Sequence, residues 1–192
     1  MLYWFLRTVI RFILLFWRRW RVIGLENLPA QGGVVVVANH VSNLDPVVVG
    51  CALNRQVHFM AKIELFRNAL LGMLIRQLGA FPVNREKSDR QAIRTALELL
   101  HAGRVVGIFP EGTRSKTGEI QKPHLGAALL AFKADAPLLP VAVKGTRGFF
   151  SRVTVVVGKP IYIPDLWHSK PGKGELEQIS DQVMGTIATL AK

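Results

Sequence analysis

The chain of 192 residues is long enough to form one domain with a sizeable hydrophobic core. Hydrophobic residues make up 49% of the chain and charged residues 20%, which excludes an intrinsically disordered protein. The net charge of +12 favours an anionic partner, such as nucleic acid, anionic lipid or a phosphorylated substrate. A single cysteine, Cys51, excludes an intrachain disulfide.

Residues 1–23 carry five arginines, no acidic residue and many large apolar side chains. On a helix, which turns about 100° per residue, one narrow stripe contains Arg7, Arg11, Arg18 and Arg21. A cationic stripe on a broad apolar helix predicts an amphipathic segment in the headgroup region of a membrane, where anionic lipid attracts the arginines. Two alternatives remain: an amphipathic helix packed on the domain, and a short spanning anchor with snorkelling arginines.

Strand-like and helix-like segments alternate through residues 24–192. Apolar runs rich in β-branched residues predict buried strands at 33–38, 57–61, 104–109, 138–143 and 152–157. The stretches between and after them predict helices at 46–54, 64–77, 88–101, 123–134 and 173–190. This alternation predicts a single α/β domain with a largely parallel mixed sheet flanked by helices.

A polar island at 39–45 separates two runs of valine. His40 follows a predicted strand directly, so it lies at the carboxyl end, where open α/β sheets gather their ligands. Asp45 precedes Pro46, so we expect Asp45 to be the N-cap of the next helix. A carboxylate beside an imidazole makes the histidine a better general base. The alternative is that these polar residues only build a turn and a cap.

A second polar segment, FPEGTRSKTGE at 109–119, follows the predicted strand 104–109 and therefore reaches the same sheet edge. Gly112 lets a ligand approach the backbone closely, and Arg114 is well shaped to bind a phosphate. Glu111 is a candidate partner for a base or an arginine. Taken alone, the segment also fits a solvated, charged turn.

Together these segments resemble the motifs of the glycerolipid acyltransferase family, in particular the 1-acylglycerol-3-phosphate acyltransferases. The motif N-H-x4-D matches residues 39–45, and F-P-E-G-T-R-S matches residues 109–115. A looser motif with glycine, phenylalanine and arginine matches 79–85, and a proline-valine strand matches 138–145. The AKIEL segment at 61–65 is also similar to the family.

The resemblance implies that His40 is the general base and that Asp45 orients it and stabilises its charge. The acceptor hydroxyl would attack an acyl thioester, acyl-CoA or acyl carrier protein, without an acyl-enzyme. The phosphorylated glycerol acceptor would be held by Lys62, Arg85, Glu111, Gly112, Thr113 and Arg114. The resemblance further implies phosphatidic acid as product, no metal or cofactor, no nucleic acid, and a place at the cytoplasmic face of an anionic phospholipid membrane.

Two rival interpretations remain. In the first, the protein acylates another acceptor, such as glycerol 3-phosphate, another lysophospholipid or a lyso-aminolipid. In the second, it is a non-catalytic basic protein that binds membranes or nucleic acid. The intact pair of His40 and Asp45 and the presence of Glu111 argue against the second, and neither zinc-finger spacing nor an aromatic RNA-binding signature occurs.

Overall fold

The computed structural model describes residues 2–84, 89–148, 150–163 and 171–192. Its strands are β1 (Arg21–Ile23), β2 (Val34–Ala38), β3 (Val57–Lys62), β4 (Phe81–Val83), β5 (Val105–Ile108), β6 (Leu138–Lys144) and β7 (Thr154–Val157). Its α-helices are α1 (Leu2–Arg18), α2 (Asp45–Ala52), α3 (Ala69–Gln77), α4 (Arg90–His101), α5 (Gly126–Ala134) and α6 (Lys173–Leu190).

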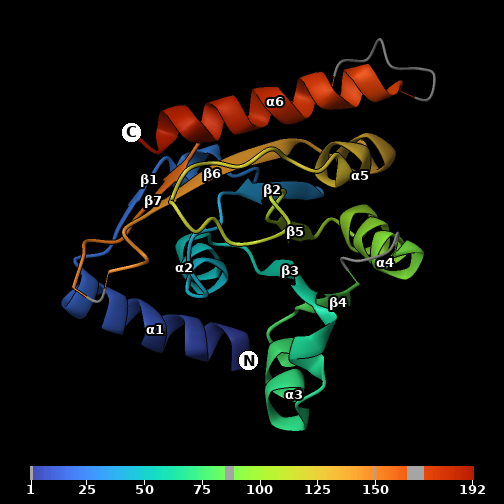
Figure 1. The fold of residues 1–192 in the computed structure, drawn as a ribbon. Coiled ribbons are helices and arrows are strands. Elements are labelled where there is room, and N and C mark those ends of the chain that lie inside the picture. The colour runs from blue at the N-terminus through green and yellow to red at the C-terminus, as the bar shows by residue number, and fades with distance from the viewer. Residues whose placement is uncertain (1, 85–88, 149, 164–170) are drawn as a thin grey trace.

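The strands form one seven-stranded sheet in the order β1-β7-β6-β2-β5-β3-β4 (Figure 1). The five strands from β6 to β4 run parallel to one another. Strand β7 runs antiparallel to β6, and β1 pairs in parallel with β7. The predicted α/β fold with a largely parallel mixed sheet is therefore confirmed, and each of the five predicted strands is present.

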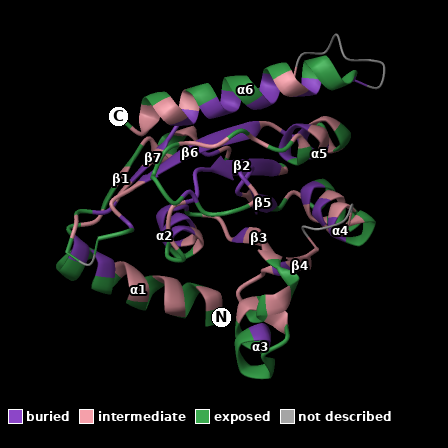
Figure 2. Ribbon diagram, in the orientation of Figure 1, coloured by how far each residue is buried: buried purple, intermediate pink, exposed green. Residues whose placement is uncertain are grey.

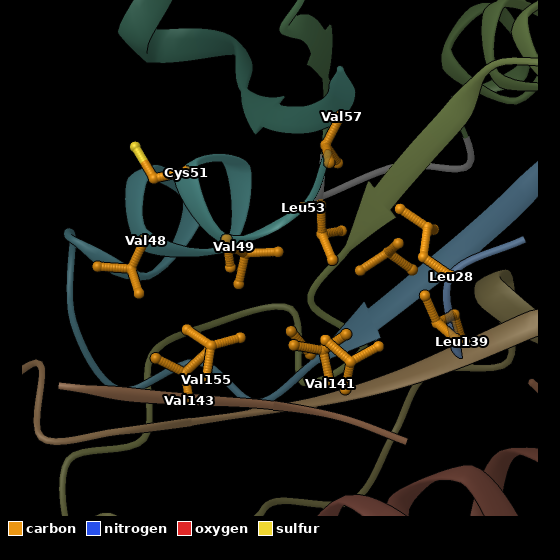
Figure 3. Close-up of a cluster of buried hydrophobic side chains, with 14 of the residues drawn as sticks. Leu28, Val48, Val49, Cys51, Leu53, Val57, Leu139, Val141, Val143 and Val155 are labelled. Atoms are coloured by element: carbon orange, nitrogen blue, oxygen red, sulfur yellow. The ribbon is translucent and has the colours of Figure 1, made fainter. Parts of the chain in front are cut away.

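The valine run of β2 is buried on both faces of the sheet. Val34 and Val36 belong to a cluster with α2, of which Figure 3 shows Val48 and Val49 beside the sheet. Val35 belongs to a second cluster formed with α4, α5 and α6 on the opposite face. Because both faces of β2 are covered, the strand needs apolar side chains at successive positions instead of alternating ones.

The N-terminal helix is shorter than predicted. Helix α1 ends at Arg18, and Arg19 adopts a left-handed conformation with φ of 44°. Residues 21–23, which we predicted to be helical, form β1 and hydrogen-bond to β7 at the edge of the sheet. The prediction is wrong there because pairing with a distant strand outweighs the local helical pattern.

The segment predicted as a helix at 64–77 consists of two pieces. A 3₁₀ turn, η2 (Ile63–Phe66), precedes α3. The Asn68 side chain accepts a hydrogen bond from the Leu71 backbone N–H at 3.0 Å, which caps α3 at its N-terminus. A new helix therefore begins at Ala69.

Candidate active site

The polar segments meet because they follow neighbouring parallel strands. Strands β6, β2, β5 and β3 are adjacent in that order, and their carboxyl ends lie at one edge of the sheet. The loop after β2 carries His40, the loop after β5 carries Glu111, and β3 ends at Lys62. The sheet topology thus places residues far apart in the sequence around one position.

His40 and Asp45 meet on the turn between β2 and α2. Asp45 Oδ2 lies 2.9 Å from His40 Nδ1. The same oxygen accepts hydrogen bonds from the backbone N–H groups of Val41 and Ser42, each at 2.6 Å. Because a carboxylate only accepts hydrogen bonds, Nδ1 carries the proton in this contact, and Nε2 of the neutral ring has a free lone pair.

The predicted capping role of Asp45 is wrong. Asp45 is the first residue of α2, and its side chain binds N–H groups of the preceding turn instead of those of the helix. Pro46 follows it in the first turn of α2, as expected. The N–H groups of the turn and the His40 ring compete successfully for the carboxylate, so the turn closes around it.

Aromatic rings stack on one another beside His40. The His40 ring stacks on Phe109 with centroids 4.2 Å apart, and Phe109 stacks on Phe59 with centroids 5.6 Å apart. His40 is only 9% exposed. Its Nε2 atom makes no hydrogen bond to any residue in the described ranges, so this nitrogen is available to a substrate.

Glu111 binds the backbone of the same turn. Its Oε1 accepts the His40 backbone N–H at 2.8 Å, and its Oε2 accepts the Gln121 N–H at 3.2 Å. The side chain is buried, and this burial raises the pKa of the Glu111 carboxyl despite both hydrogen bonds. In this arrangement Glu111 supports the turn that carries His40.

Four other predicted acceptor residues lie around the same edge. Thr113 and Arg114 are exposed on the loop after β5, and Gly112 adopts a positive φ of 70° that suits glycine. Lys62 is half-exposed and pairs with Glu64 at 3.4 Å. Arg85 lies outside the described residues.

Sequence reasoning missed two residues, Thr146 and Arg147. Thr146 is buried, and its hydroxyl donates to Asp45 Oδ1 at 2.6 Å. Arg147 donates to the backbone carbonyl oxygens of Val41, at 3.2 Å, and of Ser115. Both residues follow β6, so the topological signal that placed His40 at the sheet edge applied to them as well.

Comparison with known proteins identifies the family. The family model described as Acyltransferase matches residues 19–144. The chain belongs to the acyltransferase family. The chain is also similar to a 1-acyl-sn-glycerol-3-phosphate acyltransferase of Bacillus subtilis, with 35% identity over 88% of this chain and 87% of the Bacillus protein.

Two further proteins agree with this assignment. A 1-acyl-sn-glycerol-3-phosphate acyltransferase of Borreliella burgdorferi is 30% identical over 74% of this acyltransferase and 58% of its own length. The crystal structure of the 1-acyl-sn-glycerophosphate acyltransferase from Thermotoga maritima has a TM-score of 0.71 and 28% identity, over 96% of this chain and 80% of that one.

Helix α1 of this acyltransferase turns its arginines toward the domain. Arg7 and Arg11 donate to backbone carbonyl oxygens at the C-terminus of α2, and Arg18 is buried against the loop after β6. For the buried Arg18, the predicted contact with anionic lipid is wrong; for Arg7 and Arg11, which are half-buried, it stays a prediction. All three make the contact with the domain that we considered as the alternative. Arg7 and Arg11 do so because unpaired carbonyl groups at a helix C-terminus attract cations, and Arg18 binds carbonyl groups of a loop.

Exposed residues alternate with half-buried and buried ones along α1 (Figure 2), and the exposed residues on the face opposite the arginines are largely apolar. Its large exposed side chains are Leu2, Trp4, Phe5, Val9, Phe12, Ile13, Leu15, Phe16 and Trp17. Apolar side chains of α3 are exposed too, with Leu70 at 76%. Within the described ranges, no helix has both the length and the apolar character required to cross a bilayer.

Proposed function

We propose that this acyltransferase moves a fatty acyl group from acyl-CoA or acyl carrier protein to the free hydroxyl of 1-acylglycerol 3-phosphate, giving phosphatidic acid. The observation that carries the proposal is the buried contact between His40 and Asp45, on a turn that also hydrogen-bonds to the loop carrying Arg114. The related proteins of Bacillus subtilis and Borreliella burgdorferi are 1-acyl-sn-glycerol-3-phosphate acyltransferases, which supports the choice of acceptor.

The proposed reaction begins with proton transfer. Nε2 of His40 takes the proton of the acceptor hydroxyl, whose oxygen attacks the thioester carbonyl carbon and forms the new ester. The carbon–sulfur bond breaks, and the departing thiolate receives the proton from the imidazolium. Asp45 stabilises the imidazolium between these steps, and general-base assistance of this kind is worth about 10²- to 10⁴-fold in rate.

The acceptor phosphate is held by the loop after β5 and its neighbours. Arg114 contributes a guanidinium that matches a phosphate, and Gly112, Thr113, Lys62 and Arg85 complete this site in the proposal. Glu111 acts through the turn it supports. Holding the phosphate places the hydroxyl beside His40, which converts binding energy into a productive orientation. The reaction uses no metal or cofactor in this proposal.

The proposal also places the protein at the membrane surface. The exposed face of α1 lies in the interface of an anionic phospholipid membrane, at the cytoplasmic side, where thioester donors are water-soluble and lysophospholipid acceptors are embedded. An exposed apolar helix face of this size is typical of interfacial helices.

One assay tests the reaction. Purified protein is mixed with lysophosphatidate vesicles and labelled acyl-CoA or acyl carrier protein, and phosphatidate formation is measured. Parallel assays with glycerol 3-phosphate and with other lysophospholipids identify the preferred acceptor. We expect His40→Ala to lose turnover by about 10²- to 10⁴-fold while its thermal unfolding stays unchanged. Full activity in a folded His40→Ala protein would refute the mechanism, and faster turnover with another acceptor would refute the substrate.

A further inference from the structure

The Asp45 carboxylate is completely buried and has donors at both oxygens. Its exposed fraction is 0%. Oδ2 accepts from the His40 ring and from two backbone N–H groups, which all belong to its own turn. Oδ1 accepts from the Thr146 hydroxyl, 101 residues away in the chain. The orientation of the carboxylate therefore depends on a second loop.

This second donor fixes the plane of the carboxylate. Three donors at Oδ2 hold one oxygen in place, but they leave the group free to turn until Oδ1 is held too. A buried, charged oxygen without a donor is costly, so loss of the Thr146 hydroxyl favours rotation of the carboxylate. This rotation weakens the hydrogen bond from His40 Nδ1.

The backbone around Thr146 is built to hold this hydroxyl over Asp45. Gly145 has a φ of +79°, and a Cβ there would lie 1.8 Å from the carbonyl oxygen of Arg152. The Gly145 carbonyl oxygen accepts hydrogen bonds from Arg18 Nη2 and from Ser151 Oγ, each at 2.7 Å. The buried Arg18 side chain therefore ties the Thr146 loop to the end of α1.

The next residue connects this loop to both motif segments. Arg147 Nε donates to the carbonyl oxygen of Val41, on the His40 turn. Another of its guanidinium nitrogens donates to the carbonyl oxygen of Ser115, in the loop after β5. The Ser115 N–H in turn donates to the His40 carbonyl oxygen at 2.8 Å. The Thr146 loop is thus fastened to the two segments that form the candidate active site.

We propose that Thr146 is a positioning residue for acyl transfer, whose hydroxyl holds the Asp45 carboxylate in the plane that keeps the proton of His40 on Nδ1 and the lone pair on Nε2. This assignment rests on the proposed function of His40 as the general base. With this role for Thr146, the loop after β6 belongs to the active site.

Kinetics of Thr146→Val, which keeps the shape but removes the hydroxyl, test this role. Because hydrogen bonds to charged groups are strong, we expect kcat to fall about 10- to 100-fold while KM for acceptor and donor stays within about twofold. Thr146→Ser, which keeps the hydroxyl, should restore kcat to within about threefold of the wild type. Thr146→Ala, which leaves space for a water, replaces the valine variant if that protein does not fold.

Ser151→Ala is the matched control, because it deletes a hydroxyl from the same loop that, among the described residues, binds the backbone carbonyl oxygens of Gly145 and Gly148 and not Asp45. Because Arg18 still holds the Gly145 carbonyl oxygen in this variant, we expect kcat to stay within about threefold of the wild type. A similar loss of kcat in Ser151→Ala and Thr146→Val would show that loosening of the loop, and not the contact with Asp45, controls turnover, and would overturn the proposal. Wild-type kcat in a folded Thr146→Val protein would overturn it as well.

Nuclear magnetic resonance of ¹⁵N-labelled histidine separates this proposal from the proposed function, because it requires no substrate. The His40 signals are assigned from their loss in His40→Ala. We expect the Nδ1–H tautomer in the wild type and a mixture of tautomers in Thr146→Val. An unchanged tautomer would refute the positioning role even if lysophosphatidate proved to be the wrong acceptor. An inactive wild type with the expected tautomer change would refute only the proposed function.

Discussion

The guanidinium of Arg7 donates two hydrogen bonds to the backbone carbonyl oxygen of Leu53, at 2.7 and 3.1 Å. Leu53 is the C-cap residue of α2, the helix whose first residue is Asp45. This contact orients α1: the arginines of its cationic stripe bind the domain, and five of its aromatic side chains, Trp4, Phe5, Phe12, Phe16 and Trp17, remain exposed. The same helix therefore fastens to the protein through arginines and presents apolar surface to its surroundings.

Replacing Arg7 with alanine tests the contact with the domain. The variant loses both hydrogen bonds to Leu53, so we expect the free energy of unfolding to fall by about 1–2 kcal/mol. Urea unfolding followed by circular dichroism measures this change. Binding to anionic vesicles should not change, because this guanidinium faces the domain. Weaker vesicle binding with unchanged stability would show that Arg7 contacts lipid.

A triple variant, in which serine replaces Phe5, Phe12 and Phe16, tests the exposed face of α1. Their exposed fractions are 65%, 60% and 79%, so the loss of these rings should cost the folded domain little. Burial of one such side chain is worth about 1.5–3 kcal/mol, so we expect vesicle partitioning to fall at least about tenfold for each ring. Vesicle sedimentation provides the measurement.

Tyr162→Ser is the matched control for the phenylalanine variants. Tyr162 is an aromatic residue of similar exposure, 66%, that lies outside α1. It should leave vesicle partitioning unchanged. If the triple phenylalanine variant partitions like the wild type, α1 is not the element that binds the membrane.

Replacing Arg114 with alanine tests the phosphate site. The loss of a guanidinium that pairs with a phosphate should raise the KM for lysophosphatidate, or lower kcat, by about 10- to 100-fold. The KM for the acyl donor should stay unchanged in the same steady-state assay. Arg94→Ala removes one positive charge from an exposed position of α4 and controls for a general electrostatic effect. A defect confined to the donor would remove Arg114 from the acceptor site.

Replacing Glu111 with glutamine tests the effect of burying this carboxyl. In the folded protein the pKa of the Glu111 carboxyl is raised above its ordinary value of 4.5. The stability that this carboxyl contributes is therefore fully present below pH 4.5, and it is lost as the pH rises through the pKa of the folded state. Glutamine does not titrate. The stability of the wild type relative to Glu111→Gln should therefore decline from acid to neutral pH in urea unfolding experiments. A difference independent of pH would show that burial does not raise this pKa.

Local sequence patterns were sufficient for most of the sheet and for the central pair. The valine runs at 33–38 and 138–143 mark strands covered on both faces, because such strands need no polar face. The short spacing between His40 and Asp45 allowed one turn to bring the two side chains together. β1 could not be recognised, because three residues acquire strand geometry only through pairing with β7, more than 130 positions later.

The sequence by itself determined which segments gather at the sheet edge that carries His40, because adjacent parallel strands bring their carboxyl ends together independently of the loop sequences. Only the tertiary structure decided where individual side chains point. It turned Arg7, Arg11 and Arg18 toward backbone carbonyl groups, directed Glu111 to the backbone N–H of His40, and placed Thr146 on Asp45. These contacts join segments up to 133 residues apart. At such separations each side chain has many available partners, and neither the periodicity nor the spacing of the sequence selects one of them.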